Sequence, residues 1–232
     1  MRRPNPAILG EFNPGMTRPG ILALAALIAL AGLPASPVPV LAAPPAATSL
    51  SEAEKADLGR VEAYLDGIDT LKSQFLQISD SGQSVRGTFY LKRPGRMRIE
   101  YDQPVEDFVV ADGSFVFFWD AELKQQSNAP IGSTLADFIL RPDLKLSGDV
   151  TVTGVERGQG VLEVTLVQSS DPGLGKLTLV FEDQPLRLRK WRVLDAQGLT
   201  TEVALLNPEA GVALKDELFY FREPAQKRRN RD

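Results

Sequence analysis

The sequence predicts a mainly β protein built on one antiparallel sheet that must curve strongly or close into a barrel. Short segments rich in β-branched and aromatic residues recur at regular spacing after residue 70, and Gly, Pro, Asp and Asn fill the turns between them. Only two segments show the helical spacing of apolar residues. A flat sheet of roughly ten strands would expose long edges and one bare apolar face. We therefore expect a highly curved sheet, with both helices covering its concave side.

The first expected helix begins at a capping box, Ser51-Glu52-Ala53-Glu54, in which the first and last side chains satisfy each other's free backbone amides. Gly67 is a typical helix stop. Apolar residues between these signals recur at helical spacing: Leu58, Val61, Leu65 and Ile68. One amphipathic helix therefore precedes the strands.

The expected strands follow this helix to the C-terminal end. They span residues 71–78, 85–91, 97–101, 108–111, 115–119, 124–126, 150–155, 161–167, 176–181, 186–194, 200–205 and 219–221. In the second of them Val85, Phe89 and Leu91 share one face, and polar residues occupy the other, which is typical of a half-buried strand. The alternation vanishes between Phe115 and Trp119, so we expect that strand to be covered on both faces.

A second, short helix is expected between the two sets of strands. Ser133 or Thr134 caps it, and Pro142 ends it. Leu135, Phe138 and Ile139 fall on one face of this helix. A helix this short needs an apolar surface on which to fold, so we expect these three side chains to cover the mouth of the curved sheet.

The N-terminal region is typical of a secretory signal peptide. Residues 21–33 form an apolar run that is too short to span a bilayer, and small residues and prolines follow it. We assign residues 1–42 to the signal peptide, with Met16 as a possible true start, and expect no stable membrane insertion. The mature chain is expected to be a single domain over residues 43–222. A basic, disordered tail is expected over residues 223–232.

The composition excludes several classes of function. With no His and no Cys, the chain lacks disulfides, Ser-His and Cys-His nucleophiles, and the commonest transition-metal sites. A net charge of −4 without a basic stripe argues against nucleic-acid binding. The carboxylates Glu100, Asp102, Glu106 and Asp107 flank a strand end and a turn, which indicates a solvated face. We therefore expect a protein without enzymatic activity, catalytic residues, bound metal or cofactor.

The excess of apolar side chains on a curved sheet has two interpretations. The residues either fill an ordinary β-core or line a hydrophobic container. If there is a container, residues that share strand faces or lie on the doubly apolar strand should line it. These are Phe89, Leu91, Met97, Ile99, Phe117 and Trp119.

Residues 68–125 resemble the periplasmic outer-membrane lipoprotein carrier family, LolA. The segment Ser73-Gln74-Phe75-Leu76-Gln77 is similar to the opening strand of that family. Residues 87–98, which read GTFYLKRPGRMR, resemble its Gly-x-Phe-x-x-Lys-Arg-Pro segment, and Val110-Ala111-Asp112-Gly113 resembles its turn. The order and spacing of the three pieces fit the family together.

The resemblance implies an incomplete antiparallel β-barrel, or half-barrel, closed by helices over a hydrophobic cavity. Such a protein is a monomeric chaperone in the periplasm of Gram-negative bacteria. It holds the acyl chains of lipoproteins between an inner-membrane exporter complex and an outer-membrane receptor. The resemblance also implies that Arg93 latches the lid through backbone carbonyls, and that Met97 lies near the cavity mouth.

Two alternative functions stay open from the sequence. The same half-barrel could serve as an envelope adaptor that senses lipid or lipoprotein and regulates another protein. A secreted enzyme that uses carboxylates is the third hypothesis. Turnover that disappears when one carboxylate is changed would favour the enzyme, whereas release of a bound lipoprotein to a receptor would favour the carrier.

Overall fold

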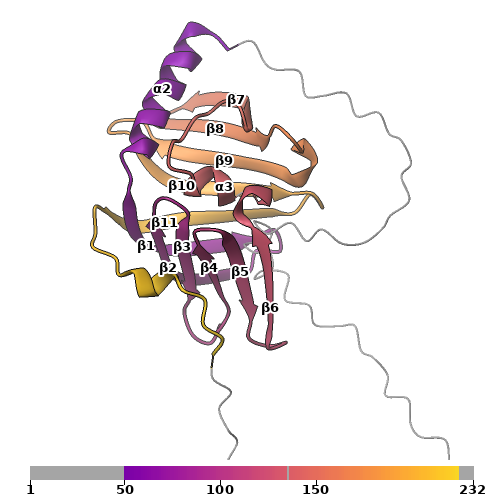
Figure 1. The fold of residues 1–232 in the computed structure, drawn as a ribbon. Coiled ribbons are helices and arrows are strands. Elements are labelled where there is room, and N and C mark those ends of the chain that lie inside the picture. Colours follow the sequence, from indigo (N-terminus) through magenta and orange to yellow (C-terminus); the bar gives the residue numbers. More distant parts are fainter. Residues whose placement is uncertain (1–49, 135, 225–232) are drawn as a thin grey trace, which may run out of the picture.

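The computed structural model describes residues 50–134 and 136–224, which form one antiparallel sheet with helices against it (Figure 1). The predicted signal peptide with Met16, the lid residue Leu135 and residues 225–232 of the predicted tail lie outside the described residues. No helix in the described ranges is long and apolar enough to cross a membrane.

Eleven strands make up the sheet in the described part of the chain, in the order β6-β5-β4-β3-β2-β1-β11-β10-β9-β8-β7. Two series of hairpins meet where β1 pairs with β11, and β6 and β7 remain as free edges. The first half contains β1 (Thr70–Ser79), β2 (Ser84–Lys92), β3 (Arg96–Tyr101), β4 (Phe108–Asp112), β5 (Phe115–Asp120) and β6 (Gln125–Pro130). The second half contains β7 (Val150–Gly158), β8 (Val161–Gln168), β9 (Gly175–Glu182), β10 (Arg187–Asp195) and β11 (Thr200–Ala210).

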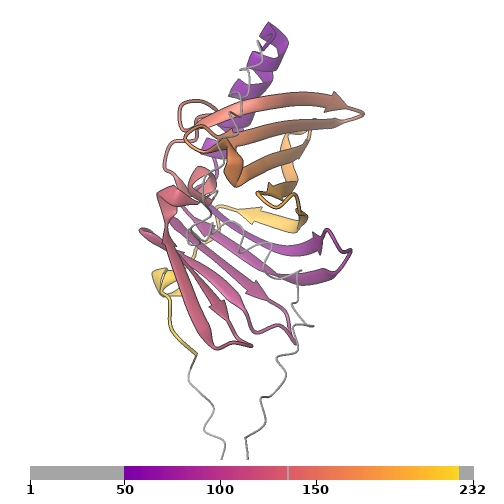
Figure 2. The same ribbon diagram turned by 90° about the vertical axis from the view of Figure 1, so that its right-hand side faces the viewer.

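The sheet is strongly curved and open. Figure 2 shows strands β7–β10 of the second half, which we call the β7–β10 half, folded over the β1–β6 half, with the small helix α3 (Ala136–Leu140) at their junction. The predicted mainly β fold with an incomplete antiparallel barrel is therefore confirmed. The curvature has the expected cause, because a large buried cluster gathers apolar residues from both halves and from the helices on the concave side.

Helix α2 (Glu52–Asp66) begins where the capping box predicts. The Glu54 amide donates to Ser51 Oγ at 3.3 Å, and the Ser51 amide donates to the Glu54 carboxylate at 2.7 Å. The helix packs against the β7–β10 half. There Tyr64 meets the ring of Phe181 edge-on at 5.9 Å and accepts a hydrogen bond from the Leu188 amide at 3.1 Å.

One glycine in the β2–β3 hairpin explains part of the sequence motif. A Cβ atom on Gly87 would lie 2.1 Å from the main-chain oxygen of Glu100 and 2.8 Å from the ring of Phe75. No other residue fits this position without moving the neighbouring strand, because an oxygen of the backbone cannot swing away. Gly87 therefore allows β1, β2 and β3 to pack closely beside the inward-facing Phe75.

The predicted strand at residues 219–221 is wrong. Residues 216–219 form the short 3-10 helix η3 (Asp216–Phe219), and the residues after it are irregular. We call residues 211–224 the C-terminal strap, because they leave β11 at Gly211 and contact β3 and β4. Apolar side chains hold the strap in place of a hydrogen-bonded ladder. Phe219 is fully buried, and Phe221 stacks on Phe117 at 5.1 Å.

Candidate functional site

The concave face of the β2–β3 hairpin carries four buried apolar side chains. Phe89 pairs directly with Ile99, and Leu91 pairs with Met97. These four side chains are each 1–2% exposed and belong to the large concave cluster. The structure thus brings together four of the six residues that the sequence assigned to the cavity lining. In this conformation the face is covered.

Phe117 and Trp119, the other two predicted lining residues, lie on the opposite face of the sheet. Phe117 pairs with Val110. Val110 and Trp119 belong to a separate cluster beneath Phe221 of the strap. The prediction of an inward orientation is wrong for both residues, because the strap covers the convex face and makes both sides of β5 apolar.

The inward residues of β5 were missed by the sequence analysis. Val116 and Phe118 pair with Ala111 and Val109 on β4, and all four belong to the concave cluster. No sequence signal could have separated Phe118 from Phe117, since neighbouring aromatic residues on a doubly covered strand look alike. The first four residues of β4 are also apolar in an unbroken run, so they do not indicate which face of that strand points inward.

A short segment packs against the concave cluster, and we call it the lid. It consists of the 3-10 turn η1 (Ile131–Ser133) and helix α3. Phe138 is 5% exposed and belongs to the concave cluster, and Ile139 packs against that cluster while it remains partly exposed. Ala136 and Leu140 are also buried, and the sequence analysis did not single them out.

Arg93, directly after β2, reaches the C-terminal ends of both helices. Its Nε donates to the main-chain oxygen of Ile139 at 2.8 Å, and its Nη1 donates to that of Leu65 at 2.5 Å. Carbonyls in the last turn of a helix lack intrahelical partners and form the negative end of its dipole, so a cation is favourable there. Burial lowers the pKa of Arg93, which the nearby carboxylates of Asp66 and Asp69 oppose. The guanidinium stays charged.

The turn that carries Arg93 is held by two further main-chain contacts. The Arg93 amide donates to Asp69 at 2.8 Å, and the Gly95 amide donates to the Leu140 oxygen of the lid at 2.7 Å. Gly95 has a φ of +75°, and a Cβ atom there would lie 2.8 Å from the Cα atom of Gly113. The Lys-Arg-Pro-Gly turn and the Asp-Gly turn of the sequence motif therefore touch each other beneath the lid.

A charged network fixes α2 to the β7–β10 half at the end far from the lid. Asp57 is buried and accepts hydrogen bonds from Arg157 of β7 and from Arg60. Both arginines also reach Asp183, at 2.9 and 3.0 Å. The hydrogen bond from Arg157 is the main reason that the pKa of Asp57 lies below its usual value. Helix α2 is thus tied to β7 and to the residue that follows β9.

The lid also has a polar side. Asp137 and Phe138 of α3 line a small cavity of about 20 Å³ together with residues of β7, β8 and β9. Arg141 at the end of the lid forms ion pairs with Asp137 and with Asp149.

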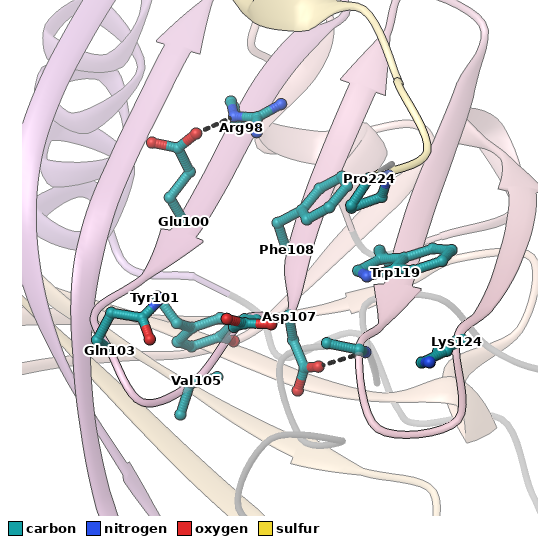
Figure 3. A pocket seen from close by; sticks show the side chains of 12 residues that line it. Arg98, Glu100, Tyr101, Gln103, Val105, Asp107, Phe108, Trp119, Lys124 and Pro224 are labelled. Carbon is teal, nitrogen blue, oxygen red and sulfur yellow. Dashed lines mark hydrogen bonds and ion pairs between the residues drawn. The ribbon is translucent and has the colours of Figure 1, made fainter. Parts of the chain in front are cut away.

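A larger pocket of about 620 Å³ is lined by Phe108 and Trp119 of the convex face and also by Tyr101, which belongs to the concave cluster. Figure 3 shows Phe108, Trp119 and Pro224 on one side of it, and Tyr101 and Asp107 on the other. Charged groups of both signs line this pocket, and several are already bonded within the protein. It is separate from the surface that the lid covers.

The described residues hold no group of three or more His, Cys, Asp or Glu placed to bind a metal ion. The carboxylates Glu100, Asp102, Glu106 and Asp107 lie at partly or fully exposed positions near the larger pocket. Glu100 forms an ion pair with Arg98.

Comparison with known proteins matches one family model over most of the chain. A family model described as outer membrane lipoprotein carrier protein LolA matches residues 66–222. An outer-membrane lipoprotein carrier protein from Methylococcus capsulatus is 30% identical over 184 residues, which cover 75% of this chain and 88% of that protein. A carrier protein of the same name from Pseudomonas fluorescens is 30% identical over 201 residues, which cover 81% of this chain and 92% of that protein. Another from Dechloromonas aromatica is 31% identical over 172 residues, which cover 70% of this chain and 81% of that protein.

Proposed function

Because the chain belongs to the outer membrane lipoprotein carrier family LolA, we propose that it shields the acyl chains of lipoproteins on the concave face of its sheet. It carries them through the periplasm of a Gram-negative cell, from an inner-membrane exporter to an outer-membrane receptor. The family assignment makes the protein a carrier and not an enzyme. The observation that carries the proposal is an apolar sheet face covered by the short helix α3. The side chain of Arg93 holds this helix through a hydrogen bond to the main-chain oxygen of Ile139.

The lid covers the concave face, so lipid binding requires the lid to move. Helix α3 has five residues and is far too short to persist away from an apolar surface. Helix α2, by contrast, has fifteen residues and is tied to β7 through Asp57 and Arg157. We propose that α3 moves while α2 stays with the β7–β10 half, so that the space opens between the lid and the β2–β3 hairpin.

Arg93 is the proposed latch of this lid. Its guanidinium bonds the ends of the fixed helix and of the moving helix at once, through Leu65 and Ile139. Hydrogen bonds to a charged group are worth about 1.5–3 kcal/mol each, which is enough to favour the closed state and small enough to be overcome by lipid. Acyl chains that enter the cavity would displace α3 and break the bond to Ile139. When the lipid leaves, this bond forms again.

The energetics require an imperfect container. Burial of each acyl methylene is worth roughly 0.8 kcal/mol, so three complete acyl chains would contribute roughly 35 kcal/mol. That exceeds the upper limit of about 20 kcal/mol for non-covalent affinity. A carrier must also release its cargo. We therefore propose that the concave face shelters only part of the lipid, and that the free energy needed to lift the lid from the sheet offsets part of the binding energy.

Loading and transfer of a purified lipoprotein test this function. The protein is incubated with inner-membrane vesicles that contain the exporter and a triacylated lipoprotein, and soluble complexes are then presented to the outer-membrane receptor. We expect a soluble complex that needs the acyl chains and passes its cargo to the receptor. The same lipoprotein without acyl chains is the control. Equal binding of both forms would contradict the proposal, and binding without transfer would favour a sensing adaptor.

A further inference from the structure

The C-terminal strap binds the end of the β2–β3 hairpin, next to the turn that carries Arg93. Asp216 of η3 accepts hydrogen bonds through one carboxylate oxygen from Lys92 Nζ at 2.6 Å and from Arg96 Nη1 at 2.8 Å. Lys92 also donates to the main-chain oxygen of Leu214 at 2.9 Å. Lys92 and Arg96 flank the turn that contains Arg93. The two outer cations of the Lys-Arg-Pro-Gly-Arg motif, Lys92 and Arg96, therefore bind the strap, and the inner cation Arg93 binds the lid.

Lys92 and Arg96 form the last pair of the β2–β3 ladder, directly opposite each other. Like charges at opposite positions of an antiparallel pair destabilise it, and Arg93 adds a third cation one residue further on. The Asp216 carboxylate lies between the first two cations and compensates them. The hydrogen bond from Lys92, followed by the charge of Arg96, lowers the pKa of Asp216.

The end of the β2–β3 hairpin contacts the strap on one side and the lid on the other. On the convex side the strap holds Lys92 and Arg96, whereas on the concave side Arg93 and Gly95 hold the lid at Ile139 and Leu140. Any change in how the last pair of the ladder is held alters the position of the turn. The guanidinium must reach two carbonyls at the same time, so it tolerates little displacement.

We infer that Asp216 is a positioning residue for the lid latch, and that the C-terminal strap thereby sets how readily the lid opens. This inference rests on the proposed role of Arg93. Asp216 does not touch the lid. It acts by cancelling the repulsion between Lys92 and Arg96, which keeps the turn in the position that the latch requires.

The chain offers matched variants for the test. Asp216→Asn removes the charge, while Phe219, which is fully buried, keeps the strap attached. Glu217→Gln is the control, because it makes the same charge change on the next residue of η3, which is exposed. Glu217 has no ion pair in the described part of the chain. Asp216→Asn with Arg96→Gln removes one of the two opposed cations as well.

Amide hydrogen exchange on the protein without lipid reports lid opening directly. The Gly95 amide is bonded to Leu140 of the lid, and its exchange rate is measured by NMR in each variant. We expect Asp216→Asn to raise this rate about three- to tenfold, because the variant loses two partly exposed ion pairs and leaves Lys92 opposite Arg96 without the carboxylate between them. We expect no change with Glu217→Gln, and we expect Arg96→Gln to reverse most of the effect of Asp216→Asn.

Salt and a latch variant complete the test. At 1 M salt the Debye length falls to about 3 Å, so the difference between Asp216→Asn and the unmodified protein should shrink. A rise that neither salt nor Arg96→Gln reverses would overturn the inference, because it would show only that the strap had come loose. Arg93→Leu must raise Gly95 exchange in the same measurement. If Arg93→Leu raises it and Asp216→Asn does not, the inference is wrong and the latch stands. If Arg93→Leu has no effect, the proposed latch fails, and this inference fails with it.

Discussion

Arg93 Nε donates to the main-chain oxygen of Ile139 across 2.8 Å, so the turn between β2 and β3 holds the end of the helix that covers those strands. The residues are 46 positions apart in the chain. The acceptor is a carbonyl at the C-terminal end of a very short helix, where it has no partner within the helix. A contact of this kind depends on the position of the helix and not on the identity of its side chains.

Arg93→Leu should yield a protein that loads lipoprotein but releases it poorly. The variant loses the bonds to Leu65 and Ile139 and adds an apolar side chain at the mouth of the cavity. Burial of a Leu side chain is worth about 1.5–3 kcal/mol, so we expect transfer to the receptor to slow about tenfold or more. Transfer and loading are measured on the same preparation. Arg93→Lys should be intermediate, since an ammonium cannot reproduce the planar fork. Normal transfer by Arg93→Leu would show that this arginine is only a turn residue.

Phe138→Glu should lower the binding of an acylated lipoprotein. Phe138 is a buried aromatic side chain of the lid, and a carboxylate at this position cannot dock on the apolar face without a large desolvation cost. Phe115→Glu is the matched control, because Phe115 is 41% exposed at the start of β5. We expect about a tenfold loss of affinity for Phe138→Glu, which corresponds to roughly 1.4 kcal/mol, and little change for Phe115→Glu. If both variants changed the affinity equally, α3 would be an ordinary surface helix with no role in lipid binding.

Lipid should contact one face of the sheet only. With a photoreactive amino acid at position 97, irradiation of the loaded protein should attach acyl chains, because Met97 belongs to the concave cluster. The same group in place of Phe117 should attach none, since Phe117 stacks against Phe221 on the convex side. Mass spectrometry of the irradiated protein identifies the adducts. Attachment at position 117 but not at 97 would place the lipid site on the wrong face for this proposal.

Asp57→Asn should destabilise the protein by about 1–3 kcal/mol above pH 5, since it removes a charged hydrogen bond partner of Arg157 and Arg60. The pKa of Asp57 is lowered in the folded state, from an unfolded value of about 3.9. Its contribution is therefore complete above the unfolded pKa and disappears as the pH falls through the folded pKa. Urea unfolding at a series of pH values should show the two proteins converging in acid.

Glu52→Gln on the same helix is the control for that series. Glu52 pairs with Lys55 on the surface, and its side chain is 90% exposed. Exposed pairs of this type contribute about 0.2–1 kcal/mol at most. If Asp57→Asn were no more destabilising than Glu52→Gln, the network around Arg157 would not be what anchors α2.

Much of the hairpin that carries the site could be predicted from the sequence. Phe89 and Leu91 alternate with polar residues along β2, and Met97 and Ile99 do so along β3, so a period of two allows only one face to be apolar. The capping box likewise determined where α2 begins. These are local properties, because each depends on the residues of one helix or one hairpin.

Tertiary structure alone decided the orientation of β5 and the anchorage of the lid. Phe117 and Phe118 are both large and apolar, and only the strap, more than ninety residues later in the chain, determines that Phe117 faces outward. The pattern of side chains gives no sign that Arg93 would meet Leu65 and Ile139, because the acceptors are main-chain oxygens that every residue possesses. Only the family resemblance implied a bond from Arg93 to backbone carbonyls of the lid. Side-chain patterns specify which surface of a strand is buried only when its two faces differ, and they do not specify which backbone groups meet. Contacts between backbone groups of distant segments depend on how those segments pack in the tertiary structure.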